Sequence, residues 1–127
     1  MKIVKDLFYT EDHEWIKVEG DEAYIGITDF AQEQLGDIVY VELPEIDEEF
    51  VKEDAFSAVE SVKAASDIYM PVDGSIIEVN EELLDAPELI NTDAFEAWIV
   101  KIKLEDESQL DELMSSGEYE EYVAEEE

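Results

Sequence analysis

Cysteine and arginine are absent from this chain, and histidine occurs only once. Without cysteine the chain can form no disulfide, and one histidine cannot supply the nitrogen ligands of a zinc site, so we expect no metal centre. No apolar run approaches the ~20 residues that a membrane-spanning helix needs. The N-terminal residues have neither the apolar core of a signal peptide nor an arginine-rich transit pattern. These absences predict a soluble, cytoplasmic protein.

Positive charge is scarce as well. The chain has 38 acidic residues against 7 lysines, which gives a formal net charge of −31. A surface this acidic repels nucleic acid and anionic membranes, because it offers no basic patch for phosphate groups. It suits proteins with basic docking surfaces, which it would attract over long distances. Adaptation to high salt or a role in solubility explains the same composition, and both interpretations stay open.

The length of 127 residues predicts one domain over 1–127, with a core at about 7–104 and a C-terminal helical segment at about 108–124. Short runs with two-residue periodicity predict several strands and hairpins. Thr28 is a suitable cap for a helix over 29–35 that Gly36 ends. The acidic stretch 45–54 lacks the glycine and alternating ligands of a calcium loop, so we expect a solvated loop and an edge strand there.

The expected elements follow one another closely along the chain. The predicted segments are strand runs at 15–18 and 23–27, a strand at 37–43, runs flanking residue 63, a strand at 75–79, a short helical connection at 81–92 and a strand at 98–104. Two helices, capped at Ser108 and Ser115, close the chain. The second has one apolar stripe of Tyr119, Tyr122 and Val123, and 125–127 forms a frayed tail.

Lys63 lies at the bend between two strand-like runs within 56–70. Most exposed lysines only aid solubility. The carboxylates of Glu60 and Asp67 lie close in sequence and favour the charged form of Lys63, whereas Schiff-base lysines need a lowered pKa. Lys63 therefore fits a substrate for acylation better than a catalyst. The neighbours His13 and Glu14 are the nearest approach to an acid–base pair, but adjacent residues of a strand point to opposite faces.

The segment Glu60-Ser61-Val62-Lys63-Ala64-Ala65-Ser66-Asp67 resembles the lipoyl-lysine motif of the glycine cleavage system H protein family. Two other carrier families differ from this chain, which has Val62-Lys63-Ala64. Biotinyl domains usually place methionine on both sides of the lysine, and lipoyl domains of 2-oxoacid dehydrogenases usually have Asp-Lys-Ala. Further blocks resemble the family in order and spacing, so that the resemblance covers essentially the whole chain. These blocks are Tyr9–Trp15, Ile25–Gln32, Leu35–Pro44 and Pro87–Asn91.

The resemblance implies a mainly β fold, a flattened barrel-sandwich hybrid of the lipoyl type, with short helices of which two are C-terminal. It implies a monomeric, non-catalytic carrier with lipoate amide-linked to Lys63. Such a carrier takes the aminomethyl group of glycine from glycine decarboxylase to aminomethyltransferase and is reoxidised by dihydrolipoyl dehydrogenase. A lipoate ligase or lipoyltransferase would attach the cofactor.

The resemblance also suggests a role for three carboxylates, because Asp12, Glu14 and Asp67 match the residues that hold the amine of the loaded arm in a surface cleft. Independently of the resemblance, we expect the hairpin carboxylates Glu60 and Asp67 to be exposed near Lys63, and so to matter more to partner enzymes than to stability. Two other interpretations stay open at this point. One is a lipoate-relay protein of the same family, and the other is an unmodified acidic interaction module in which Lys63 has no special role.

Overall fold

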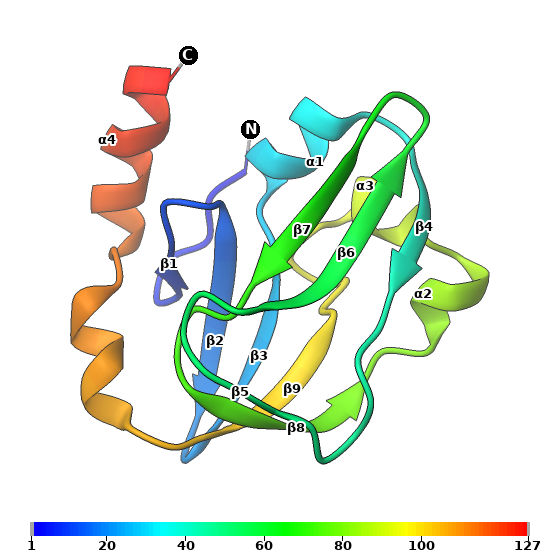
Figure 1. Cartoon of the computed structure of the whole chain (residues 1–127). Helices are drawn as coiled ribbons and strands as arrows, with labels where there is room; N and C mark the ends of the chain where they lie inside the picture. The colour runs from blue at the N-terminus through cyan, green and yellow to red at the C-terminus, as the bar shows by residue number, and fades with distance from the viewer. Residues whose placement is uncertain (1, 127) are drawn as a thin grey trace.

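The strands form two sheets, of six and three strands, in a computed structural model that describes residues 2–126 (Figure 1). In spatial order, the larger sheet contains β1 (Phe8–Tyr9), β2 (Glu14–Glu19), β3 (Glu22–Ile27), β9 (Val100–Leu104), β8 (Gly74–Val79) and β5 (Glu49–Phe50). The predicted β2–β3 hairpin is confirmed. The acidic stretch 45–54 contains the short edge strand β5, as its composition predicts.

The smaller sheet consists of β4 (Ile38–Glu42), β6 (Ala55–Ser61) and β7 (Ala65–Tyr69), with β6 in the centre. β6 and β7 form the predicted antiparallel hairpin around Lys63, and Glu60 opposite Ala65 is the last pair before its tip. In Figure 1 this hairpin crosses in front of the larger sheet and its tip extends beyond α1 (Asp29–Leu35).

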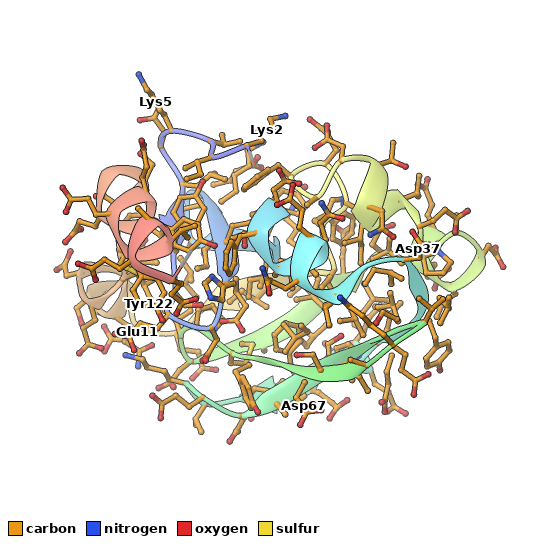
Figure 2. The ribbon with its side chains drawn as sticks, turned by 90° about the horizontal axis from the view of Figure 1, so that it is seen from above. Lys2, Lys5, Glu11, Asp37, Asp67 and Tyr122 are labelled. Carbon is orange, nitrogen blue, oxygen red and sulfur yellow. The ribbon has the colours of Figure 1, made fainter. Side chains whose placement is uncertain are left out.

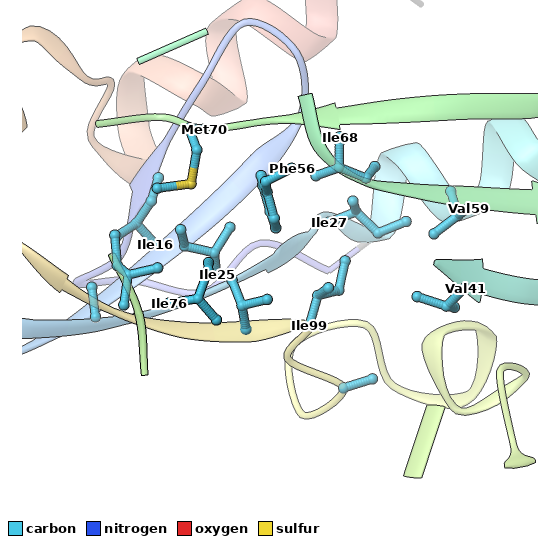
Figure 3. Packing of buried hydrophobic residues seen from close by; sticks show 14 of the residues in the cluster. Ile16, Ile25, Ile27, Val41, Phe56, Val59, Ile68, Met70, Ile76 and Ile99 are labelled. Carbon is cyan, nitrogen blue, oxygen red and sulfur yellow. The ribbon is translucent and has the colours of Figure 1, made fainter. Parts of the chain in front are cut away.

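The main core lies between the two sheets. Ile16, Ile25 and Ile76 of the larger sheet and Val59 and Ile68 of the smaller one lie in the layer between the sheets (Figure 3), and all five are buried. Strand alternation places these residues on inner faces while polar residues face outward. The mainly β architecture with short helices is as predicted.

Helix α1 connects the two sheets and ends beside the Lys63 hairpin. Its N-cap is Thr28, whose Oγ1 accepts a hydrogen bond from Ala31 N at 3.2 Å. Its C-cap is Gly36, with φ 79° and ψ −154°, a backbone conformation that only glycine adopts readily. Both caps are as predicted. β4 begins two residues after Gly36, so the cap determines where this edge of the smaller sheet starts.

The remaining helices are short. They are α2 (Glu82–Asp85), α3 (Leu89–Thr92), the 3₁₀ helix η1 (Glu107–Glu112) and α4 (Ser116–Glu126). The predicted cap at Ser108 is wrong, because Asp106 Oδ1 accepts from Ser108 N at 3.0 Å and so caps η1. The capping box at Ser115 is confirmed by reciprocal hydrogen bonds with Glu118. The tail expected to fray at 125–127 is helical as far as Glu126, and Glu127 lies outside the described residues.

α4 packs beside β1, at the side of the molecule away from β4 (Figure 1). The Tyr119 ring stacks on that of Tyr9, with centroids 4.5 Å apart and an interplanar angle of 7°. Tyr119 and Val123 are buried, and Tyr122 is half-buried, so the predicted apolar stripe does face the core. None of the helices within residues 2–126 is long and apolar enough to cross a membrane.

Gly26 leaves room for the indole of Trp15 on the neighbouring strand. A β-carbon at residue 26 would lie 2.6 Å from Trp15 Cζ2, and the indole is held by its hydrogen bond to Ala94 O at 3.1 Å. We expect Gly26→Ala to lower the free energy of unfolding by about 1–3 kcal/mol, the usual range for overpacking. Urea unfolding measures this loss.

Gly117→Ala is the control, because no atom lies within 4 Å of a β-carbon built there. It should leave stability unchanged or raise it slightly, since alanine favours helix. Equal losses of stability in the two variants would contradict the packing role of Gly26.

Candidate functional site

Lys63 occupies the tip of the β6–β7 hairpin. Ser61 N donates to Ala64 O at 2.7 Å and closes the turn, and Ser61 Oγ accepts from Ala64 N at 3.0 Å. Val62 N donates to Asp37 O at 3.1 Å, which fastens the tip to the residue before β4. These bonds hold the backbone of the turn while the Lys63 side chain stays exposed.

The surroundings of Lys63 suit modification of its amine. None of the ion pairs within residues 2–126 involves Lys63, so Glu60 and Asp67 do not pair with it as their closeness in sequence suggested. A β-carbon at Gly36 would lie 3.6 Å from Lys63 Cε, so the aliphatic part of the side chain passes over the end of α1. An exposed amine on a well-held turn fits covalent attachment of an acyl group.

Asn91 supports the corner on which this turn rests. Its Oδ1 accepts from Ile38 N at 2.8 Å, and its Nδ2 donates to Gly36 O at 2.9 Å and to Gln32 Oε1 at 2.8 Å. One α3 side chain therefore joins the end of α1 to the start of β4. The predicted short helical connection at 81–92 gave no sign of this role.

Glu14 is a buried carboxyl at the start of β2, with 1% of its surface exposed. Thr10 Oγ1 donates to its Oε1 at 2.6 Å, and Tyr69 N donates to its Oε2 at 3.3 Å. Burial raises the pKa of Glu14 to about 7, because the charged form loses hydration. The two hydrogen bonds oppose this rise, and the nearby charge of Asp12 adds to it.

Glu14 lines a cavity of about 250 Å³ between the β1–β2 turn, the β5–β6 loop, the residues that follow β7 and the end of η1. Its walls combine apolar side chains with acidic ones and one lysine. They are Tyr9, Thr10, Glu11, Asp12, Glu14, Lys52, Glu53, Met70, Pro71, Glu112, Leu113 and Met114. Apolar walls suit a hydrocarbon chain, and carboxylates suit an ammonium group through charge-assisted hydrogen bonds.

The structure brings two of the three expected amine-holding residues together. Asp12 and Glu14 both line the cavity, whereas Asp67 does not. Asp67 lies opposite Ala58 on β6 and is exposed on the outer face of the smaller sheet, as Figure 2 shows from above. Glu60 is exposed near the Lys63 end of the same sheet.

Known proteins resemble the chain along its whole length. The family profile described as glycine cleavage H-protein matches residues 7–126. The chain belongs to this family. The H protein of Alkaliphilus oremlandii is 62% identical and that of Halothermothrix orenii 54%, each alignment covering at least 98% of both chains. A crystal structure of the H protein from Mycobacterium marinum is similar with a TM-score of 0.84 and 36% identity, covering 98% of both chains. Family membership supports a carrier role in the glycine cleavage system.

In this family member, the ring of His13 hydrogen-bonds α4 and does not work with Glu14 as an acid–base pair. His13 has φ 66° in the turn before β2, so its side chain points toward α4 while that of Glu14 is buried. Its Nδ1 hydrogen-bonds Tyr119 Oη at 2.9 Å, and its Nε2 lies 3.1 Å from Glu126 Oε2. Tyr122 Oη also donates to Glu11 O, and these two residues lie together in Figure 2.

Sequence reasoning missed Lys52 as a cavity residue. Its Nζ donates to Glu112 Oε2 at 2.8 Å, which links the loop after β5 to η1. Sixty residues separate the two partners in the chain, and no local pattern signals their approach.

The raised pKa of Glu14 makes stability depend on pH. Its folded-state pKa of about 7 exceeds the ordinary value of 4.5, so the folded protein binds more protons than the unfolded chain between these values. Stability should therefore fall as pH rises from about 4.5 to 7. A rise of the pKa from 4.5 to about 7 corresponds to about 3 kcal/mol in the free energy of unfolding.

Glu14→Gln removes this titration. We therefore expect the free energy of unfolding of the variant, relative to that of the wild type, to increase by roughly 3 kcal/mol between pH 5 and pH 8, as measured by urea unfolding. Glu120→Gln removes one charge from the exposed face of α4 and serves as the control. If both variants change in parallel with pH, general charge repulsion explains the effect and burial of Glu14 does not.

Proposed function

We propose that this chain is the lipoyl carrier of a glycine cleavage system, with lipoate attached to Lys63 through an amide. The observation that carries the proposal is the exposed, unpaired Lys63 on a hydrogen-bonded hairpin tip, among the described residues of a chain that belongs to the H-protein family. When bound, lipoate would supply a disulfide whose reductive opening leaves one sulfur to carry a one-carbon amine unit and the other as a thiol. The chain itself holds and presents the arm, and its role is that of a carrier and not of a catalyst.

The proposed partners are glycine decarboxylase, aminomethyltransferase and dihydrolipoyl dehydrogenase, with a lipoate ligase or lipoyltransferase to attach the arm. Tethering keeps the cofactor at high local concentration for each enzyme in turn. The net charge of −31 favours partners with basic surfaces around their entrances. Glu60 and Asp67, exposed on the outer face of the smaller sheet, belong in this proposal to the surface that partners contact.

Glu14 and Asp12 are the proposed holders of the loaded amine. An amine in the cavity would meet the Glu14 carboxyl, which the Thr10 hydroxyl and the Tyr69 amide already orient. Because the pKa of Glu14 is raised to about 7, its carboxyl is partly protonated near neutral pH. An entering ammonium would favour loss of that proton, and the resulting ion pair would be shielded from water. A relay protein or an unmodified interaction module needs no such amine site, so the cavity favours the glycine cleavage role.

Lys63→Ala tests the attachment site. We expect the variant to take up no lipoate and to keep the unfolding midpoint of the wild type, because an exposed tip side chain contributes little to packing. Intact mass after incubation with lipoate, ATP and the host ligase measures uptake. Lys5→Ala is the control, since Lys5 is also exposed and forms no ion pair within residues 2–126. Uptake at another lysine in Lys63→Ala would refute the assignment.

Glu14→Ala tests the amine site. We expect the purified, amine-loaded variant to release ammonia several times faster than the wild type in the absence of aminomethyltransferase, because water gains access to the amine. Lipoylation of Lys63 should proceed normally. Glu120→Ala, an exposed carboxylate on α4, is the control. Release rates equal to that of the wild type would remove Glu14 from the proposed site.

A further inference from the structure

A β-bulge interrupts β4 next to the Lys63 hairpin. Ile38 lies opposite Ser61 and Tyr40 opposite Glu60, so Val39 is an extra residue in the register with β6. Strict alternation would bury one of two successive side chains, yet Val39 is 53% exposed and Tyr40 is 48% exposed. Bulges often redirect side chains beside functional sites. This bulge exposes an aliphatic and an aromatic side chain in succession.

The exposed apolar side chains concentrate on this part of the molecule. Seven large hydrophobic residues are exposed within 2–126, and four of them lie on the smaller sheet or at its hairpin tip: Val39, Tyr40, Val62 and Tyr69. Val62 directly precedes Lys63 and is 70% exposed, and its backbone N–H bonds the residue before β4. We call Val39, Tyr40 and Val62 the bulge patch. An apolar patch beside a modified residue indicates a contact with another protein.

We infer that the bulge patch is the docking surface for the enzyme that acylates Lys63. This inference rests on the proposed function. The acylating enzyme must bring an activated acyl carbon to Lys63 Nζ itself, so its surface must cover the residues around the tip. Enzymes that act on the far end of the attached arm meet it at a distance, and they do not need this contact.

The chemistry of acylation also requires that the enzyme cover the hairpin tip. Lys63 Nζ attacks the acyl carbon of a lipoyl adenylate, the N–C amide bond forms, and the C–O bond to AMP breaks with its electron pair leaving on phosphate. The ammonium loses two protons, one before the attack and one from the tetrahedral adduct. Attack requires a neutral amine, and covering the tip with apolar surface favours that form, because desolvation penalises the ammonium.

Charge determines the kind of partner. Asp37, Glu42 and Glu60 are exposed around the patch. The complementary surface has an apolar centre with lysine or arginine at its rim. A second copy of this chain does not match, since it would bring the same carboxylates and a net charge of −31 against themselves.

The test compares the wild type, a variant and a control as substrates of purified host lipoate ligase. Each unmodified protein is incubated with the ligase, lipoate and ATP, and intact mass measures how fast it is lipoylated. The variant is the double substitution Val39→Thr with Tyr40→Thr, because threonine keeps strand propensity and both sites are exposed. The control is Val51→Thr, at a valine that is 57% exposed but lies outside the smaller sheet. We expect kcat/KM to fall about tenfold or more in the double variant, the range of interface hot spots. The control should stay within about twofold of the wild type, as for a residue outside an interface.

Two further measurements complete the test. An unfolding midpoint equal to that of the wild type shows that the double variant is folded. Once lipoylated chemically or by prolonged incubation, the double variant should be reduced by NADH and dihydrolipoyl dehydrogenase at the wild-type rate. Equal kcat/KM for the double variant and Val51→Thr would overturn the inference. A wild type that is dimeric in solution while the double variant is monomeric would overturn it as well. A wild type that takes up no lipoate would refute the proposed function instead.

Discussion

Apolar contact between the two sheets is the interaction on which the rest of the structure depends. Side chains such as Ile25 and Val59 are fully buried there, and burying each stabilises the fold by about 1.5–3 kcal/mol. The β6–β7 hairpin belongs to this core only through its inner face. Its tip extends past the core, so Lys63 can be modified and can contact enzymes without disturbing the side chains that hold the sheets together.

Glu14 belongs to both the fold and the site. It starts β2 in the larger sheet and accepts a hydrogen bond from Tyr69 of β7 in the smaller one, so it joins the two sheets at the cavity. Burial of an ionised carboxylate is costly unless a partner compensates it. An ammonium in the cavity would supply that partner. The carboxyl whose ionisation costs stability in the empty protein would thus bind a cation more favourably than an exposed carboxylate does.

Local patterns predicted the parts of the fold that depend on nearby residues. The period-two runs located both hairpins, and Thr28 and Gly36 located the ends of α1. The bulge at Val39 escaped this reasoning, because the run 37–43 is apolar enough to fit either register and only pairing with β6 decides between them. The motif around Lys63 singled this residue out as the attachment site, which stays a prediction. The cavity that Glu14 lines was not predictable, because Lys52 and Glu112, which line it and contact each other, lie far apart in the chain.

The few lysines are used unevenly across this acidic surface. Five of the seven form ion pairs within residues 2–126, at Lys2, Lys17, Lys52, Lys101 and Lys103, and the two others are Lys5 and Lys63. Lys63 is therefore an uncompensated positive charge at the end of a hairpin that otherwise presents carboxylates. An amide at Lys63 removes that charge and changes the formal net charge from −31 to −32. The local change is larger than the total suggests, because it lies within about one Debye length of any enzyme that approaches the tip. The proposed attachment of the arm at Lys63 would thus make the hairpin end more attractive to basic surfaces, whether or not the arm is loaded.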